Sequence, residues 1–458
     1  MDNASKKNIL TEGKVLPGII SFTMPIFFGM LFQQFYNMVD TAIVGKYLGI
    51  NALAGVGSTG SLMFLVIGTV NGICSGFAIP VAQSFGAKNM DMLKRFVAGA
   101  TLLAAILSAV LTVVTVLLCN NMLVAMDTTA ESYEYAYEYL VIIFAGIPFT
   151  FLYNLTSGFL RSIGDSKSPL YFLFISSALN IALDFLFIVG FKMSADGAGL
   201  ATVISQAVSG LACLVYMSRK YEVLKLRRKD FKVNGFILFR LLSVGIPMGI
   251  QYGITAVGTI VIQAAVNSFG TITVAGVVTS GKISSLVACP LEALGAAMAT
   301  FAGQNIGAGN LDRVNRGLWQ ATFLGFGVSA VMFGVVWFFG RYIALLFMSA
   351  DEMEAMNYAM QCIRINAAFY CLLTIVLTFR YTIQGMGYST LAIFAGILEM
   401  IARCLIGIFL PAVMGFISIC IASPVAWLAA DLFLIPAYYM CLKKAKRHYS
   451  KAFHTESL

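Results

Sequence analysis

The side chains best suited to chemistry are two carboxylates set inside long apolar stretches. Asp40 lies six residues before Lys46, at the end of one stretch, and Asp184 lies near the end of another. Asn180 precedes Asp184 by four residues, so on a helix the two side chains share one face. Thr202 opens a third apolar stretch. Carboxylate, amide and hydroxyl oxygens can bind Na⁺, and two close carboxylates favour retention of a proton by one of them.

The apolar stretches are long enough to be membrane helices. Of the 458 residues 59% are hydrophobic and 11% are charged, whereas soluble domains carry about 25% charged residues. A membrane-spanning helix needs about 20 apolar residues. Runs of this kind occur at 16–45, 53–81, 97–119, 138–160, 168–190, 197–217, 236–266, 274–303, 318–339, 356–379, 389–412 and 416–442. We therefore predict an all-α integral membrane protein with 12 transmembrane helices.

The sequence repeats itself at a shift of 221 residues. Residues 49–95 align with 270–316, and 14 of these 47 positions are identical. Six spans in each copy predict two six-helix bundles related by a pseudo-twofold axis along the membrane normal, with a cleft between them. The predicted divisions are an N-terminal tail (1–15), an N-lobe (16–218), a linker (219–235), a C-lobe (236–442) and a C-terminal tail (443–458).

Both copies of the repeat contain a Gln-x-x-Gly-Ala-x-Asn loop, at 83–89 and at 304–310. Each loop is either a helix-ending turn, in which Gly stops one helix and Asp opens the next, or part of an inner gate.

Lysine and arginine mark one side of the predicted membrane. Of 30 such residues, 23 fall in the tails and alternate loops on one face, with Arg380 assigned to the tenth loop, and 3 fall on the opposite face. Because basic residues favour the cytoplasmic side, both termini are predicted to be cytoplasmic, in a plasma (inner) membrane. The net charge of +9 then indicates an anionic lipid surface and not a nucleic-acid partner. We expect a monomer.

The two carboxylates also share a depth with Thr202. At a rise of about 1.5 Å per residue, Asp40, Asp184 and Thr202 each lie about 9 Å below the outer surface. This common depth favours a shared cation site over the alternative, in which each acid caps or pairs separately to hold helices together.

Other ionisable groups inside the spans are candidates for function, because each costs free energy in a bilayer. Glu399 and Arg403 stand four residues apart and are expected to pair with each other. Lys282 and Glu292 are expected either to line the C-terminal half of the cleft or to pair elsewhere. The sequence assigns no role to the remaining two, Arg364 and Asp431.

Sequence motifs for nucleotide binding or catalysis are incomplete. Residues 55–60 match a dinucleotide fingerprint but lack the strand and the downstream acid that give it meaning. Residues 276–282 nearly match a P-loop, but Ile283 stands where a hydroxyl must hold magnesium. Both His residues lie in the C-terminal tail, which excludes an intramembrane zinc or Ser-His-Asp site. We predict no enzyme and no cofactor, only a coupling ion, H⁺ or Na⁺.

Several motifs resemble the MATE (multidrug and toxic compound extrusion) family over nearly the whole chain. They are the run from Pro25 through Gln34, Tyr36, Asn37 and Asp40 to Gly45, the loop Leu160–Pro169, the segment Asn180–Asp184 and the repeated Gln-x-x-Gly-Ala loop.

The resemblance implies an antiporter in which inward H⁺ or Na⁺ drives export of bulky, amphiphilic, often cationic compounds. It implies a cation site, possible for Na⁺ as well as H⁺, at Asp40, Asn180, Asp184 and Thr202. It also implies a hinge at Pro25. The residues expected along the substrate pathway are Gln34, Tyr36, Asn37, Lys282 and Glu292.

The chain departs from part of this family in its second half. Members with a C-lobe cation site carry acids in the seventh and tenth spans, but 236–266 and 356–379 contain no Asp or Glu. Coupling is therefore expected to rest on the N-lobe. The alternatives are a lipid-linked precursor flippase of the same superfamily, which would have a strongly basic cavity, and a membrane-embedded enzyme. The spans hold few cations, which disfavours the flippase.

Overall fold

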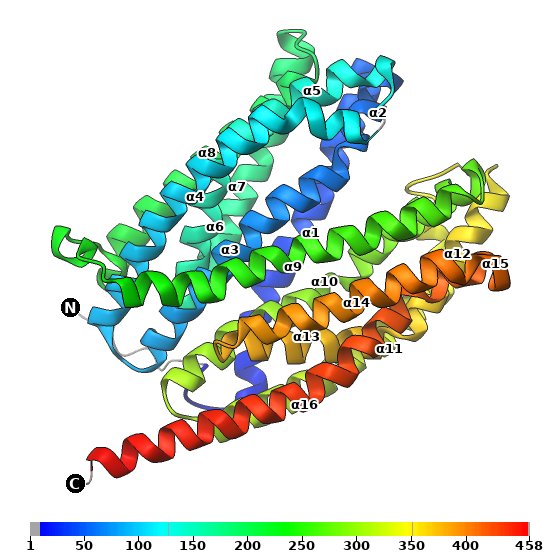
Figure 1. Cartoon of the computed structure of the whole chain (residues 1–458). Helices are drawn as coiled ribbons and strands as arrows, with labels where there is room; N and C mark the ends of the chain where they lie inside the picture. Colours follow the sequence, from blue (N-terminus) through cyan, green and yellow to red (C-terminus); the bar gives the residue numbers. More distant parts are fainter. Residues whose placement is uncertain (1–9, 127, 350, 457–458) are drawn as a thin grey trace. The chain divides into compact units, whose positions relative to one another are not determined.

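The computed structural model describes residues 10–126, 128–349 and 351–456, whose regular structure is helical throughout (Figure 1). Within these residues, ten helices are long and apolar enough to cross a membrane, and two bent helix pairs raise the number to 12 if each pair is one span. The predicted all-α membrane class is therefore confirmed, and each of the 12 predicted spans falls on a helix or a helix pair.

In the first half, long apolar runs form helices that cover the predicted spans, and most of them extend past the span at both ends. The α-helices are α1 (Val15–Leu48), α2 (Ile50–Ser58), α3 (Gly60–Gly86), α4 (Met90–Ala125), α5 (Ala130–Ala145), α6 (Ile147–Ser162), α7 (Lys167–Asp184) and α8 (Ala195–Lys220). A π-helix, η1 (Phe185–Gly190), continues α7, and two 3₁₀ turns, η2 (Glu222–Leu224) and η3 (Arg228–Phe231), lie in the linker.

The second half repeats the pattern of long helices and bent pairs. Its helices are α9 (Gly235–Asn267), α10 (Thr271–Gly307), α11 (Leu311–Ala344), α12 (Met353–Ala368), α13 (Tyr370–Gly385), α14 (Ser389–Phe409), α15 (Pro411–Met414) and α16 (Phe416–Glu456).

The fourth span of each half is bent, although the sequence predicts a continuous run in both. α5 and α6 meet at an angle of 50°, and α12 and α13 meet at 55°. The first bend lies at Gly146, directly before the helix start that holds Pro148. Proline has no N–H to donate to the preceding turn, so the helical ladder is interrupted there.

The repeated loops have the same backbone conformation. Lys88 and Gly309, which are equivalent in the repeat, have φ values of 57° and 73°. The next amide in each loop, of Asn89 or Asn310, donates to a carbonyl five residues back, at 3.0 and 2.8 Å. This is the bonding pattern of a helix that ends in a left-handed residue, so the predicted helix-ending turns are confirmed. The residue that opens the next helix is Asn89 or Asn310, and not the predicted Asp, which lies in the first turn. A role of these loops in an inner gate stays a prediction.

Contacts divide the described chain into two compact units. One is Phe28–Tyr252, and the other combines the described residues up to Phe27 with those from Gly253 onward. In the first unit α8 packs against α5, α6 and α7, and in the second α10 packs against α11, α12 and α13. α1 and α9 each contribute their two ends to different units. The lobe boundaries drawn from the repeat remain a prediction.

Within the first unit, α3 and the first part of α9 approach closely through glycines. Gly72 and Gly76 face Gly245 and Gly249, a Gly-x-x-x-Gly pair on each helix. A Cβ atom added to Gly76 would lie 2.5 Å from the Cα of Gly245, closer than side chains tolerate. Small residues let membrane helices approach backbone to backbone, which explains why both segments carry this spacing.

Candidate cation site

Three helices of the unit Phe28–Tyr252 position the predicted cation ligands. α1 carries Asp40, α7 carries Asn180 and Asp184, and α8 carries Thr202. Asp40 is 9% exposed, Asn180 is 3% exposed and Asp184 is fully buried. Burying a polar group without a partner costs free energy.

The carboxyl groups of Asp40 and Asp184 meet across α1 and α7. The two side chains interact directly with each other. Among the described residues, no N–H or hydroxyl donor serves Asp40 Oδ1 or either carboxylate oxygen of Asp184. These three buried oxygen atoms are therefore available to a cation.

Asn180 links this pair to α8. Its Nδ2 donates to Thr202 Oγ1 at 3.4 Å, which leaves Asn180 Oδ1 buried and without a donor among the described residues. Because Asn180 and Asp184 are one helical turn apart on α7, that carbonyl oxygen lies on the same face as the carboxylate. The structure therefore brings together all four residues that sequence depth and spacing had grouped.

The backbone beside Asp184 is irregular. α7 ends at Asp184, and the next six residues form the π-helix η1. π-helical turns are rare and are frequently found at functional sites. The change of helix type at this position widens the turn that directly follows the carboxylate.

Tyr139 is a neighbour of the site that the sequence did not reveal. It lies on α5, is 7% exposed, and interacts electrostatically with Asp40, Asp184 and Tyr36. Tyrosine recurs at every second position from 133 to 139, so nothing in the spacing singles out Tyr139.

The residues expected along the substrate pathway lie on α1 and α10. Gln34 and Tyr36 are half-buried and Asn37 is exposed, and Tyr36 interacts electrostatically with Asp40. Lys282 and Glu292 are exposed on α10, ten residues or about 15 Å apart along the helix. Neither forms an ion pair with a described residue, although Lys282 Nζ lies 5.6 Å from the ring centre of Phe347. Their role in the pathway stays a prediction.

The predicted hinge residue, Pro25, lies inside the continuous helix α1. Pro247 occupies the equivalent place in α9. A proline inside a helix removes one backbone hydrogen bond, so each position is a point of local weakness in an otherwise regular helix.

A second charged cluster occupies the other unit. Arg380 on α13 donates to Glu399 on α14, and Arg403 NH2 lies 3.5 Å from the same carboxylate. The predicted Glu399–Arg403 pair is therefore confirmed, but the assignment of Arg380 to a cytoplasmic loop is wrong. Arg380 is 7% exposed inside α13, because its ion pair with Glu399 offsets the cost of burying it.

The sequence assigned no role to two further charged residues of this unit. Asp431 on α16 is 3% exposed, interacts electrostatically with Arg380, and has no hydrogen-bond donor for either oxygen among the described residues. Arg364 stacks on Trp337, with the guanidinium 4.8 Å from the ring centre, and donates to the Trp337 carbonyl at 3.4 Å. Arg364 thus has a packing role.

Comparison with protein families decides the class of the chain. The MatE family model matches residues 25–186 and 247–410, one match in each half of the repeat. The chain belongs to the MatE family. Two matches of this family in tandem also account for the internal repeat at a shift of 221 residues.

Named relatives of this MatE-family chain cover most of its length. It is 29% identical to the probable multidrug resistance protein YoeA of Bacillus subtilis (strain 168), over 97% of this chain and 98% of the relative. It is 30% identical to the probable multidrug resistance protein YpnP of the same organism, over 79% of this chain and 80% of the relative.

Solved structures show the same fold. The outward-facing structure of a multidrug resistance MATE family transporter of the MOP superfamily matches with a TM-score of 0.90 at 20% identity. The match covers 97% of this chain and 100% of that chain. This MatE-family protein is therefore a membrane-embedded transporter with the MATE fold.

Proposed function

We propose that this MatE-family transporter is an antiporter that exports amphiphilic, often cationic compounds in exchange for inward H⁺ or Na⁺. The class of exported compound is suggested by the relatives, which are named multidrug resistance proteins. The exchange mechanism is supported by one observation, the buried pair of Asp40 and Asp184, three of whose oxygens have no donor in the part of the chain that the structure describes.

The carboxylate pair needs a positive charge. Two ionised carboxylates in a buried site repel each other, and each has lost its hydration. A proton on one of them, or Na⁺ between them, removes that repulsion. For Na⁺ the amide oxygen of Asn180 and the hydroxyl of Thr202 extend the ligand set, since hard cations take oxygen ligands.

The energetics require such coupling. Export of a monovalent cationic drug alone opposes about 2.3 kcal/mol per 100 mV of membrane potential. Exchange of one inward cation for one such drug moves no net charge, so the membrane potential does not contribute to the free energy of the exchange. The concentration gradient of the coupling ion then drives export, and one pH unit is equivalent to about 1.4 kcal/mol.

The helix that carries Asp40 also carries Pro25, fifteen residues earlier. We infer that a cation at Asp40 changes the bend of α1 at this proline, and that this bend links the cation to release of substrate near Gln34, Tyr36 and Asn37. Both termini face the cytoplasm in this proposal, because the basic tails and loops mark that side, and the protein works as a monomer in the plasma (inner) membrane.

Purified protein in liposomes tests this function. Ethidium efflux should follow an imposed H⁺ or Na⁺ gradient and should fail when that gradient is dissipated. The variant Asp184→Asn should lose this dependence, whereas the matched control Asp351→Asn, at an exposed carboxylate, should keep it. Transport of a fluorescent lipid-linked precursor in place of ethidium would support the flippase instead.

A further inference from the structure

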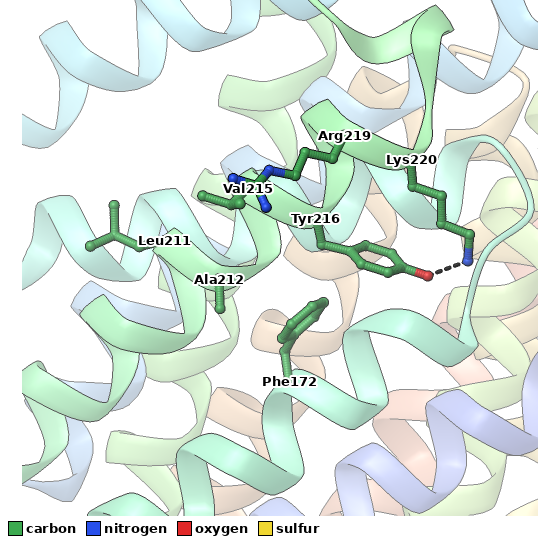
Figure 2. A pocket seen from close by; sticks show the side chains of 7 residues that line it. All are labelled: Phe172, Leu211, Ala212, Val215, Tyr216, Arg219 and Lys220. Carbon is green, nitrogen blue, oxygen red and sulfur yellow. Dashed lines mark hydrogen bonds between the residues drawn. The ribbon is translucent and has the colours of Figure 1, made fainter.

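A groove lies on the surface of the unit Phe28–Tyr252, between α7 and the last three turns of α8. Its volume is about 620 Å³. Figure 2 shows Phe172 of α7 opposite Ala212 and Tyr216 of α8, with Lys220 beside the Tyr216 hydroxyl and the Arg219 side chain extending toward Val215. The lining residues are Phe172, Leu211, Ala212, Val215, Tyr216, Arg219 and Lys220, none of which belongs to the cation site.

The two ends of the groove differ in chemistry. Leu211 and Val215 are exposed apolar side chains, 51% and 47% accessible, toward the middle of the span. Arg219 and Lys220 close the other end, where α8 terminates. From Leu211 to Lys220 the helix rises by about 13.5 Å, at about 1.5 Å per residue. The groove therefore runs from an apolar wall at membrane depth to two cations at the end of the helix.

The two cations are held differently. Lys220 donates to the Tyr216 hydroxyl and lies 4.7 and 5.3 Å from the ring centres of Tyr216 and Tyr221. Arg219 makes no hydrogen bond or ion pair with any residue that the structure describes. A guanidinium offers several N–H donors in a planar arrangement that suits phosphate oxygens. The N–H donors of Arg219 are not engaged by any described residue and can therefore bind such a group.

A hydrogen-bonded network fixes this end of the groove. Ser168 Oγ contacts the Tyr216 hydroxyl at 2.8 Å and donates to Asp165 at 2.6 Å. Tyr221 donates to the same carboxylate at 2.7 Å, and burial together with this bond raises the pKa of Tyr221. Asp165 also accepts from the Ser168 amide at 3.0 Å, so its charge is engaged by three donors. Asp165 and Ser168 of this network belong to the Leu160–Pro169 loop.

The surroundings are strongly basic. The segment that continues from α8 carries further cations: Lys225, Arg227, Arg228, Lys229 and Lys232. Of these, only Arg227 forms an ion pair with a described residue, with Glu222 at 3.6 Å. Clusters of this kind next to a membrane helix attract anionic lipid headgroups.

We propose that this groove binds a phospholipid with an anionic headgroup, such as phosphatidylglycerol. The phosphate lies at Arg219 and Lys220, and the start of one acyl chain lies along Phe172, Leu211 and Val215. The apolar wall distinguishes this ligand from free phosphate, which would gain nothing from it. The bound lipid is a resident partner and not the exported compound, so this site is separate from the proposed transport function.

Lipid retention by the purified protein tests this site. Native mass spectrometry would count phosphatidylglycerol and phosphatidylcholine of equal acyl chains bound to wild type and to the double variant Arg219→Gln, Lys220→Gln. Wild type should prefer phosphatidylglycerol, and the double variant should bind it about 30-fold more weakly, equivalent to about 2 kcal/mol at about 1 kcal/mol per basic residue.

A control of equal charge change separates the groove from general attraction. The variant Lys225→Gln, Lys229→Gln removes two exposed cations outside the groove and should weaken phosphatidylglycerol binding clearly less than Arg219→Gln, Lys220→Gln does. Equal losses in the two double variants would overturn the proposal, and so would equal binding of the two lipids by wild type.

A second variant tests the acyl-chain part. Ala212→Trp should fill the groove without changing its charge and should reduce phosphatidylglycerol binding, whereas Leu214→Trp, on the same helix but outside the groove, should not. Unchanged binding by Ala212→Trp, or displacement of the lipid by millimolar inorganic phosphate, would contradict a lipid site and indicate an anion site only.

Discussion

Asn180 donates from Nδ2 to Thr202 Oγ1 across 3.4 Å, and this bond joins α7 to α8 beside two buried carboxylates. The bond also fixes the side-chain amide, because a nitrogen engaged with Thr202 turns the carbonyl oxygen away from it. That oxygen is buried and has no donor among the described residues. In this account Thr202 thus both contributes an oxygen to the cation site and orients Asn180 in it.

The variant Thr202→Val tests this orientation. It keeps the shape of the side chain but removes the hydroxyl, so Asn180 loses its partner and the site loses one oxygen. A neutral hydrogen bond contributes about 0.5–1.5 kcal/mol, so the ion concentration for half-maximal ethidium efflux should rise about twofold to tenfold. If the ion is H⁺, the pH midpoint should fall by about 0.3–1 unit.

The matched control is Thr101→Val on α4, where the hydroxyl donates only within its own helix, to the Val97 carbonyl at 2.8 Å. Its efflux should retain the wild-type ion dependence. The same ion dependence in Thr202→Val would show that Asn180 is not oriented for cation binding.

The charged cluster of the second unit should be structural. Glu399→Gln removes the carboxylate that pairs with the buried Arg380 and Arg403, and losing one partner of a buried pair costs about 3–5 kcal/mol. We expect a clear fall in the thermal unfolding midpoint in detergent. Asp312→Asn, at an exposed pair with Lys446, should cost about 1 kcal/mol or less. Similar midpoints for the two variants would mean that the buried cluster does not stabilise the unit.

Glycine substitutions should distinguish close packing from free space. Gly76→Ala places a methyl group 2.5 Å from the Gly245 backbone, and overpacking of this kind costs about 1–3 kcal/mol. Gly327→Ala, inside α11 with nothing within 4 Å, should be neutral or stabilise by up to about 1 kcal/mol. The thermal unfolding midpoint should therefore fall for Gly76→Ala and should stay equal or rise for Gly327→Ala. A stable Gly76→Ala variant would argue against the close approach of α3 and α9.

Substitution of Arg313 should remove the hydrogen bonds that hold the segment before α1. This guanidinium donates to the main-chain carbonyls of Leu10, Glu12 and Gly13 at 3.1, 3.2 and 2.8 Å. Arg313→Gln should raise amide hydrogen exchange at the start of α1 about tenfold or more, since bonds from a charged donor contribute about 1.5–3 kcal/mol each.

Arg316→Gln is the control for this measurement, because Arg316 is exposed one turn further along α11. Exchange at the start of α1 should match wild type in that variant. Equal exchange in both variants would mean that Arg313 does not hold the segment.

Hydropathy predicted the membrane spans, and residue counts from the predicted membrane surface predicted which side chains lie at the same depth. Long apolar runs located every span, and equal distances from the membrane surface grouped Asp40, Asp184 and Thr202 before any contact was known. The i, i+4 spacing predicted the Glu399–Arg403 pair correctly. Each of these inferences uses a regular helix, which is what an apolar run in a bilayer forms.

The missed features depend on contacts between helices. Arg380 sits near the end of its apolar run and looked like a loop cation, because its partner Glu399 is 19 residues away on another helix. Tyr139 reaches the carboxylates only through the packing of α5 against α2 and α8. The bend at Gly146 could have been suspected from the nearby Pro148, but the equivalent bend at Phe369 has no glycine or proline to announce it.

The most direct test of coupling at Asp40 and Asp184 separates two kinds of transport in the same liposomes. Downhill ethidium movement needs only the substrate pathway, whereas accumulation against a gradient needs the coupling ion. The double variant Asp40→Asn, Asp184→Asn should keep downhill movement and lose H⁺- or Na⁺-driven accumulation. Uphill accumulation at the wild-type level by this variant would contradict the assignment of the cation site.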